Sequence, residues 1–429
     1  MSVAQAAVPV DVGVRAARYL LIAVLIAMQF SSSLTVGFEF GVYAVFAWFP
    51  SLRERLWFVM QQRVARALAV FLLIVVIATC YGVAPLHDRL GQLSGWRKAL
   101  LFFFAAAAFD DEDAKRELAG IYFAVCLIAL VLSAVTSAGN FSIYKGIGRG
   151  LIIHNYATQS FAFSLAIGIA VLSLVDRAKF AADPLLRHWW LAVLAIVAFV
   201  ADIAYMLPGR SGYMILIVMA VTLAATLGGG TRRTRLAAGA CVVVAVSGVL
   251  SSSPLVRQRV ELAVSEMESA EQSKNLTSGG VRVVMWRTAW QIISEHPVLG
   301  VGTAGFKTAY ERQVEGLPGW QSTPTGDPHS QYLKIWAEQG IFGLIAILAF
   351  IALALVQPGL TPYRELGVAF LLASSASSLV NSHFSTFFEG RMVFFWLGAL
   401  LSTPFGHASV EKAARADYLG GREVSEERN

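Results

Sequence analysis

Charged residues are scarce in this sequence. Asp, Glu, Lys and Arg together make up 14% of its 429 residues, whereas soluble domains average about 25%. Hydrophobic residues make up 56% of the chain, and they gather in runs long enough to cross a bilayer. This composition excludes an ordinary soluble domain and indicates an all-α polytopic integral membrane protein.

Cysteine is scarce as well. Cys80, Cys126 and Cys241 lie in or beside apolar runs, where a buried thiol behaves as a small hydrophobic side chain. A disulfide framework or a thiolate metal site is therefore not expected. Residues 1–16 also lack a compact apolar core followed by an Ala-x-Ala cleavage site, so we expect no cleaved signal peptide.

Long apolar runs divide the chain. Runs of about 17–25 residues predict helices that cross a hydrocarbon core about 30 Å thick, and we expect about twelve of them. They are predicted at 17–33, 34–50, 66–84, 97–109, 117–137, 153–175, 189–207, 211–228, 235–252, 331–356, 362–380 and 391–405. The expected domains are residues 1–252 with the first nine helices, 253–330 as one large loop, 331–405 with the last three helices, and the tail 406–429.

Lysine and arginine are unevenly distributed over the short connections. One alternating set of connections, together with both ends of the chain, holds many more of them than the opposite set. The positive-inside rule therefore places both termini in the cytoplasm and the segment 253–330 on the outer, periplasmic face. The net charge of +6 is explained by this topology, and no nucleic-acid partner is expected.

The segment 253–330 is too long for a simple connection and is therefore expected to be functional. The apolar spacing within 256–267 predicts an amphipathic helix that lies across the mouth of the bundle. Gly279–Gly280 are expected to break this pattern, which resumes and continues to Pro297. A third short helix is expected over 303–314.

Three arginines stand out on the outer face. Arg210 lies in the tight turn "MLPGRSGYM", where it can bind an anionic ligand or extend to lipid phosphates. Arg282 and Arg287 flank Trp286, but five residues are about 140° of a helix, so the two guanidinium groups do not share one face. They can grip opposite edges of a cavity, or one can bind ligand while the other braces the helix. Anchoring of Arg and Trp at the membrane interface is the alternative.

His329 is the candidate for proton transfer. Asp327 is a good N-cap and Pro328 suits the first helical position, so the sequence predicts His329 in the first turn of the following helix. The positive end of a helix disfavours imidazolium and keeps a histidine able to accept a proton. A polar histidine that simply lies at the interface is the alternative.

Three stretches resemble successive signatures of the O-antigen ligase and polymerase superfamily. They are "GRSGY", "RVVMWRTAWQIISEHPVLGVGTAGF" and "HSQYLKIWAEQGIFGL". In that superfamily an arginine at a tight turn is followed by an R-x-x-x-W helix ending in P-x-x-G-x-G. A histidine then precedes a helix carrying E-x-G-x-x-G, matched by Glu338, Gly340 and Gly343. The resemblance covers about 205–345 by motif.

The resemblance implies a GT-C-like glycosyltransferase of the bacterial inner membrane. Such enzymes move a glycan from undecaprenyl diphosphate to an acceptor on the periplasmic face. The acceptor is lipid A-core in ligases, another lipid-linked repeat in polymerases and a protein hydroxyl in O-oligosaccharyltransferases. A single dominant outer loop and a basic outer surface, suited to the anionic lipid A-core, favour the ligase, with the other two as alternatives.

The resemblance also implies roles for the site residues. Arg210 and Arg282 are expected to hold the diphosphate, with Arg287 as a second clamp beside Trp286, and His329 to act as general base. Neither a metal nor a cofactor is expected. A metal site of Asp327, His329 and Glu338 is excluded because Glu338 would lie about 14 Å along an ideal helix from His329.

Polar residues within or beside the apolar runs are further candidates. Within membrane spans such residues are costly and commonly line a substrate route, which would also suit a transporter, the rival class. Asp202 can orient Arg210 or form a structural hydrogen bond between helices. His383, Glu389 and Arg391 can contact the acceptor, or Glu389 and Arg391 can pair to end a loop. The candidates for the route are His154, Asn155, Thr158, Gln159 and Asp202.

Overall fold

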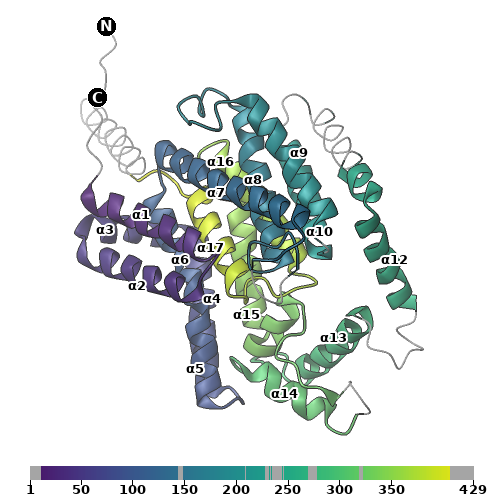
Figure 1. Ribbon diagram of the computed structural model, residues 1–429. Coiled ribbons are helices and arrows are strands. Elements are labelled where there is room, and N and C mark those ends of the chain that lie inside the picture. The colour runs from purple at the N-terminus through teal and green to yellow at the C-terminus, as the bar shows by residue number, and fades with distance from the viewer. Residues whose placement is uncertain are drawn as a thin grey trace, which may run out of the picture.

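The computed structural model describes most of the chain. It covers residues 11–405, except 144–147, 208, 228–230, 232, 234–243, 245, 269–277 and 318–321. Within these residues the regular structure is helical throughout, and Figure 1 shows the arrangement of the helices. The helices are α1 (Val12–Ala27), α2 (Ser32–Trp48), α3 (Pro50–Met60), α4 (Arg63–Tyr81), α5 (Leu86–Gly95), the 3-10 helix η1 (Trp96–Ala99), α6 (Leu100–Ala108), α7 (Glu112–Ala138), α8 (Tyr156–Val175), α9 (Trp189–Tyr205), α10 (Arg210–Leu227), α12 (Pro254–Glu268), α13 (Ser278–Glu295), α14 (Gly305–Val314), α15 (Gln331–Val356), α16 (Tyr363–Ser377) and α17 (Phe388–Leu401).

Helices occupy the apolar stretches predicted from the sequence, apart from 235–252, most of which lies outside the described residues. Four described helices, α4, α7, α8 and α15, are long and apolar enough to cross a membrane. The pair α2 and α3, bent by 98° at its junction, adds a fifth when counted as one span, while α9 and Ser211–Leu227 are apolar but shorter. The described residues are therefore apolar and helical, as a membrane protein requires, and the number of twelve spans stays a prediction.

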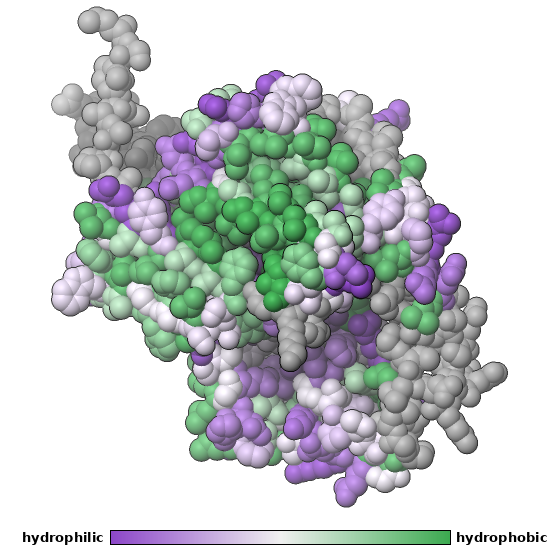
Figure 2. Space-filling view, in the orientation of Figure 1, coloured by the Kyte–Doolittle hydropathy of each residue, from purple (hydrophilic) through white to green (hydrophobic). Residues whose placement is uncertain are grey.

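The centre of the molecule is formed by α8, α16 and α17. Every residue of α17 from Glu389 to Leu401 is buried, because its run of large apolar side chains is surrounded by other helices. In Figure 1, α1, α2 and α3 lie on one flank, and α13 and α14 pack beside the lower part of α15. Figure 2 shows a broad apolar surface with hydrophilic side chains above and below it, as a bilayer requires.

Basic residues from several connections gather around the start of α7. The charge pattern had assigned these connections to one side of the membrane. Arg18 pairs with Asp111, Arg55 with Asp110 and Lys179 with Glu112, while Lys115 donates to the Ser402 hydroxyl. The contacts agree with a common side for these connections. That this side faces the cytoplasm stays a prediction.

The large loop contains the expected helices α12, α13 and α14, with one difference. Gly279 and Gly280 do not separate two helices, because α13 already begins at Ser278. In the first turn of a helix the backbone N–H groups have no intrahelical partner, so glycine costs least there. The expectation that these glycines break the pattern is therefore wrong.

Candidate active site

The helix α15, which follows His329, is broken near its start. Gly340 has φ 67° and ψ −169°, which divides α15 into a short part up to Gln339 and a long part from Ile341. A Cβ at Gly340 would lie 2.0 Å from the carbonyl oxygen of Val298. Only glycine accommodates both this backbone conformation and this close approach.

The segment 297–303 fills the break in α15. Gly300 and Gly302 also have positive φ values, 70° and 82°, which lets the segment pass between α15 and the end of α4. Its backbone satisfies polar groups that the break exposes. The hydrogen bonds are Val301 N to Ala337 O (2.8 Å), Gly302 N to Glu338 O (2.9 Å), Ile341 N to Pro297 O (3.1 Å) and Thr303 N to Ala78 O (3.1 Å). The P-x-x-G-x-G and E-x-G signatures therefore form one structural unit.

His329 does not lie in the first turn of a helix. The helix α15 begins at Gln331 with Ser330 as its N-cap, so the prediction of Asp327 as N-cap is wrong. Instead, Asp327 Oδ1 accepts the N–H of His329 at 2.9 Å, a local turn that competes with helix capping. His329 has φ 51° and is half-buried, so its side chain remains partly accessible.

Asp327 has a second partner, Ser382, whose hydroxyl donates to Oδ1 at 2.5 Å. Burial raises the pKa of Asp327, but the positive charge of Lys334 and the hydrogen bonds from Ser382 and His329 outweigh burial. The pKa of Asp327 therefore lies below its usual value of 3.8. The carboxylate is ionised at neutral pH.

The connection between α16 and α17, residues 378–387, is hydrogen-bonded to the start of α15. Gln331 is fully buried, and its side chain forms a reciprocal pair with Ser385, donating to Oγ at 2.8 Å and accepting the Ser385 N–H at 3.0 Å. The backbone N–H of Gln331 is shared between the carbonyl oxygens of Ser378 and Asn381. Lys98 of η1 donates to the carbonyl oxygens of Ser385 and Thr386 in the same connection. These contacts fix the connection and the helix start against each other.

A buried polar cluster continues from this connection to α8. Glu389 accepts hydrogen bonds from Thr158 Oγ1 at 2.5 Å and Asn155 Nδ2 at 3.3 Å. His383 Nε2 lies 2.8 Å from Ser377 Oγ. Burial lowers the pKa of His383 below its usual 6.5, although the carboxylates of Glu389 and Asp327 act in the opposite direction. His383 is therefore a neutral, enclosed imidazole.

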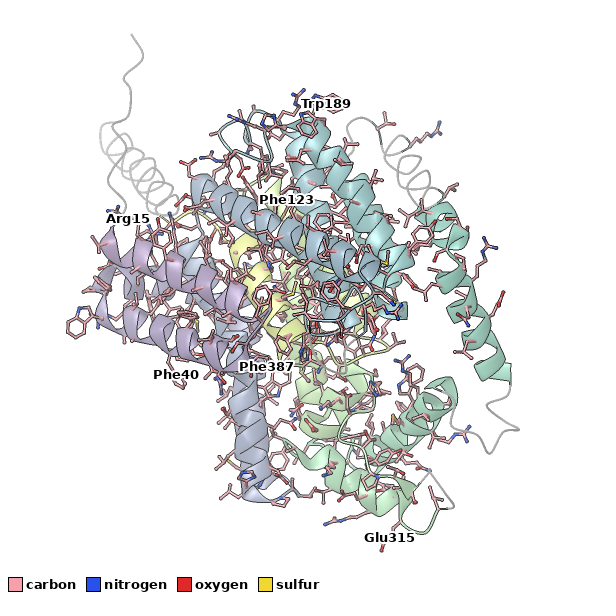
Figure 3. All side chains as sticks on the ribbon, viewed as in Figure 1. Arg15, Phe40, Phe123, Trp189, Glu315 and Phe387 are labelled. Carbon is pink, nitrogen blue, oxygen red and sulfur yellow. The ribbon has the colours of Figure 1, made fainter. Side chains whose placement is uncertain are left out.

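The helix α13 carries the other cationic candidates. Arg282 and Trp286 are half-buried, and Arg287 is exposed. The helix packs on α15, where Trp290 meets Trp336 edge to face with ring centroids 5.5 Å apart. Figure 3 shows side chains of α13, α14 and α15 filling the lower part of the molecule, with Glu315 labelled at its edge.

Comparison with known proteins gives one family match in this region. The model of the O-antigen ligase family matches residues 191–348. This part of the chain therefore resembles the O-antigen ligase family. The matched residues are less than half of the chain, and they contain most of α9, all of α10, α12, α13 and α14, and the broken part of α15.

One curated relative has no described activity. It is an uncharacterized protein of Haemophilus influenzae, 30% identical over 115 residues. The similarity covers 26% of this chain and 29% of the relative. The chain thus matches less than a third of that relative's length.

Arg210 lies in "GRSGY", the first of the three signatures, and begins α10. Its side chain lies outside the described residues. A Cβ at the preceding Gly209 would lie 3.4 Å from Tyr156 Cβ, so the turn packs against the start of α8. Asn155 and Thr158, which bind Glu389, belong to this same start. The convergence of Arg210, Arg282 and His329 on one substrate stays a prediction.

Two polar residues proposed to line a route have partners in the structure, and their place on a route stays a prediction. Asp202 accepts hydrogen bonds from Ser133 at 2.5 Å and Gln159 at 3.4 Å. These bonds join different helices, as one of the two alternatives from the sequence predicts. His154, with φ 39°, stacks on Phe388 with ring centroids 3.8 Å apart.

Glu389 and Arg391 do not pair with each other to end a loop. Arg391 binds Glu39 at 2.5 Å, and its guanidinium lies 3.7 Å from the ring centroid of Phe387, labelled in Figure 3. Glu39 also binds Arg97 at 3.2 Å.

The sequence interpretation missed Gln331, Lys98, Ser382 and Ser385. The available signal was the stretch "NSHFSTFFEGR", whose polar residues lie between two apolar runs. The sequence offers its His383, Glu389 and Arg391 as acceptor contacts, or Glu389 and Arg391 as a pair that ends a loop. In the structure, that stretch supports the histidine that precedes α15, through Ser382 and Asp327. Its importance follows from contacts between residues far apart in sequence, such as Ser382 with Asp327, which are 55 positions apart.

Proposed function

We propose that the protein is an O-antigen ligase of the bacterial inner membrane. It transfers a glycan from undecaprenyl diphosphate to a sugar hydroxyl of lipid A-core on the periplasmic face, with both termini in the cytoplasm. The observation that carries this proposal is that the P-x-x-G-x-G and E-x-G signatures form one structural unit. The P-x-x-G-x-G segment that follows α13 is bound into the break of α15 at Gly340, and the partly accessible His329 precedes the first part of this helix.

The leaving group explains the arginines. When the bond from sugar C1 to the diphosphate breaks, both bonding electrons remain on the phosphate oxygen. Planar guanidinium groups can bind this charge through paired hydrogen bonds without a divalent metal. Arg210 and Arg282 are assigned to the diphosphate, and Arg287 acts as a second clamp with Trp286 at its side.

The acceptor explains the histidine. The acceptor hydroxyl loses its proton as its oxygen attacks C1, and His329 receives that proton as general base. A single direct displacement inverts the configuration at C1. The partial exposure of His329 and its position before α15 support this role, because a base must reach a bulky acceptor that arrives from outside the bundle.

A deletion strain tests the overall reaction. Loss of the gene should remove all long glycan chains from lipopolysaccharide while polymerised glycan accumulates on its lipid carrier. Core bearing single repeats would instead identify a polymerase. Unchanged lipopolysaccharide with loss of glycan from proteins would identify a protein O-oligosaccharyltransferase.

Replacement of His329 tests the chemistry. His329→Ala should reduce transfer by about a hundredfold or more, the contribution typical of a general base, while membrane insertion and binding of undecaprenyl diphosphate persist. His87→Ala is the matched control, because His87 is 98% exposed on α5. Transfer by His329→Ala at the rate of this control would remove His329 from the mechanism.

A further inference from the structure

The carboxylate of Asp327 accepts a hydrogen bond from the backbone of His329. Its Oδ1 accepts the His329 N–H at 2.9 Å and the Ser382 hydroxyl at 2.5 Å. One oxygen atom therefore joins the segment before α15 to the connection between α16 and α17. None of the sequence signatures includes Asp327 or Ser382.

The backbone of His329 needs such a restraint. Its φ of 51° lies in the left-handed region, which residues other than glycine adopt only when the surroundings impose it. The hydrogen bond from its N–H to Asp327 closes the turn that holds this conformation. The direction of the imidazole follows from the conformation, because Cα and Cβ move with the backbone.

The restraint is anchored in a rigid part of the molecule. Ser382 belongs to residues 378–387, which Gln331 and Lys98 hold from two sides. Both of these side chains are buried, with 0% and 3% exposure. A hydroxyl in this position can fix the carboxylate, whereas a carboxylate on a free loop could not fix the histidine.

We propose that Asp327, oriented by Ser382, is a positioning residue that aims the imidazole of His329 at the acceptor hydroxyl. Asp327 itself touches neither donor nor acceptor. The inference rests on the proposed role of His329 as general base. It adds a second requirement to that role, since the base must be both present and held in a left-handed backbone conformation.

The hydrogen bonds and the charge of Asp327 can be separated by substitution. Asp327→Asn keeps an Oδ1 that accepts both hydrogen bonds but removes the charge. Asp327→Ala removes both, and Ser382→Ala leaves the carboxylate without its anchor. If positioning is the role, Asp327→Asn should function and Asp327→Ala should not.

The kinetic test uses the full-length protein reconstituted in lipid, with a lipid-linked glycan donor and lipid A-core as acceptor. A misplacement of about 1 Å can cost about a hundredfold in rate, so kcat of Asp327→Ala should fall by about that factor. Its KM for the donor should stay near that of the wild type, and Asp327→Asn should recover most of the loss. The double variant His87→Ala, Asp88→Ala is the control, because it removes an exposed His and Asp pair on α5.

A second readout does not require activity. Diethyl pyrocarbonate modifies accessible imidazole groups, and mass spectrometry gives the modification rate of each histidine. In Asp327→Ala the rate at His329 should change severalfold, while the rate at His87 in the same molecule stays constant. Asp327→Asn should retain the wild-type rate at His329.

The outcomes are distinct. If His329→Ala is inactive but Asp327→Ala transfers glycan normally, the positioning role is wrong and the proposed function stands. If Asp327→Asn is as inactive as Asp327→Ala, the charge matters and positioning by hydrogen bonds is wrong. If the wild type transfers no glycan, the proposed function fails, and the modification rates still show whether Asp327 sets the orientation of His329.

Discussion

The amide nitrogen of Gly302 lies 2.9 Å from the carbonyl oxygen of Glu338. This hydrogen bond joins two glycine-containing signatures that are separated in sequence by the helix α14 and the segment before α15. Glu338 is itself bound by Gln92 of α5. Gly300, Gly302 and Gly340 of these signatures have positive φ values, so the backbone geometry of the broken helix favours glycine at all three positions.

Gly340→Ala should strongly destabilise the fold. Alanine at φ 67° costs about 1–2 kcal/mol, and its Cβ would collide with the carbonyl oxygen of Val298, so we expect a total loss of about 3 kcal/mol or more. Gly316→Ala is the matched control, because Gly316 also has a positive φ, 81°, but open space around it. Thermal unfolding in detergent measures both. Equal losses in the two variants would show that the collision is relieved without cost.

Arg282→Lys should impair donor binding and transfer although it preserves the charge. Lysine lacks the planar fork that binds two phosphate oxygens at once, and the loss of one charge-assisted hydrogen bond is worth about 1.5–3 kcal/mol, or roughly a tenfold to hundredfold loss of kcat/KM. Arg312→Lys, on the exposed side of α14, is the control. Donor binding and transfer rates measure the effect. Arg282→Lys with the activity of this control would assign Arg282 to anchoring at the interface.

Acid should destabilise the protein through His383. The pKa of His383 is lowered by burial from its usual 6.5, so the unfolded chain takes up a proton below about pH 6.5 before the folded protein does. Stability associated with the neutral imidazole is therefore fully present above that pH and is lost as the pH falls toward the lowered pKa. His383→Gln should reduce the slope of Tm between pH 7 and 5. His87→Gln should leave it unchanged, and equal slopes in all three proteins would contradict the buried, neutral state.

The sequence predicts the helices well because apolar runs are local. The three signatures can also be read directly from the sequence, and Gly300, Gly302 and Gly340 within them occupy positions with positive φ. The start of α15 could not be predicted, since the side chain of Asp327 binds the His329 N–H and a serine 55 positions away. A single sequence does not reveal such a partner, and the usual capping pattern of Asp and Pro then misleads.

The buried charges illustrate the same limit. Glu39 lies within the span predicted at 34–50, where an isolated carboxylate would be costly. The structure supplies Arg391 and Arg97 as its partners, from segments far along the chain. Pairing of this kind depends on tertiary packing, so neither the partner nor the role of Glu39 follows from its neighbours in sequence.

Glu39→Gln should cost about 3–5 kcal/mol of stability, because removal of one partner leaves buried charge without compensation. Glu39 is fully buried and Arg391 is 2% exposed, so water cannot replace the lost carboxylate. Glu311→Gln is the matched control, since Glu311 pairs with Lys307 on the surface of α14 at 3.9 Å, and surface pairs contribute about 0–1 kcal/mol. Thermal unfolding in detergent compares the two. If Glu39→Gln lost as little stability as the control, the Glu39 carboxylate would not be what holds α2 to α17. The packing of Phe46 on Phe104, with ring centroids 4.6 Å apart, would then have to stabilise this flank.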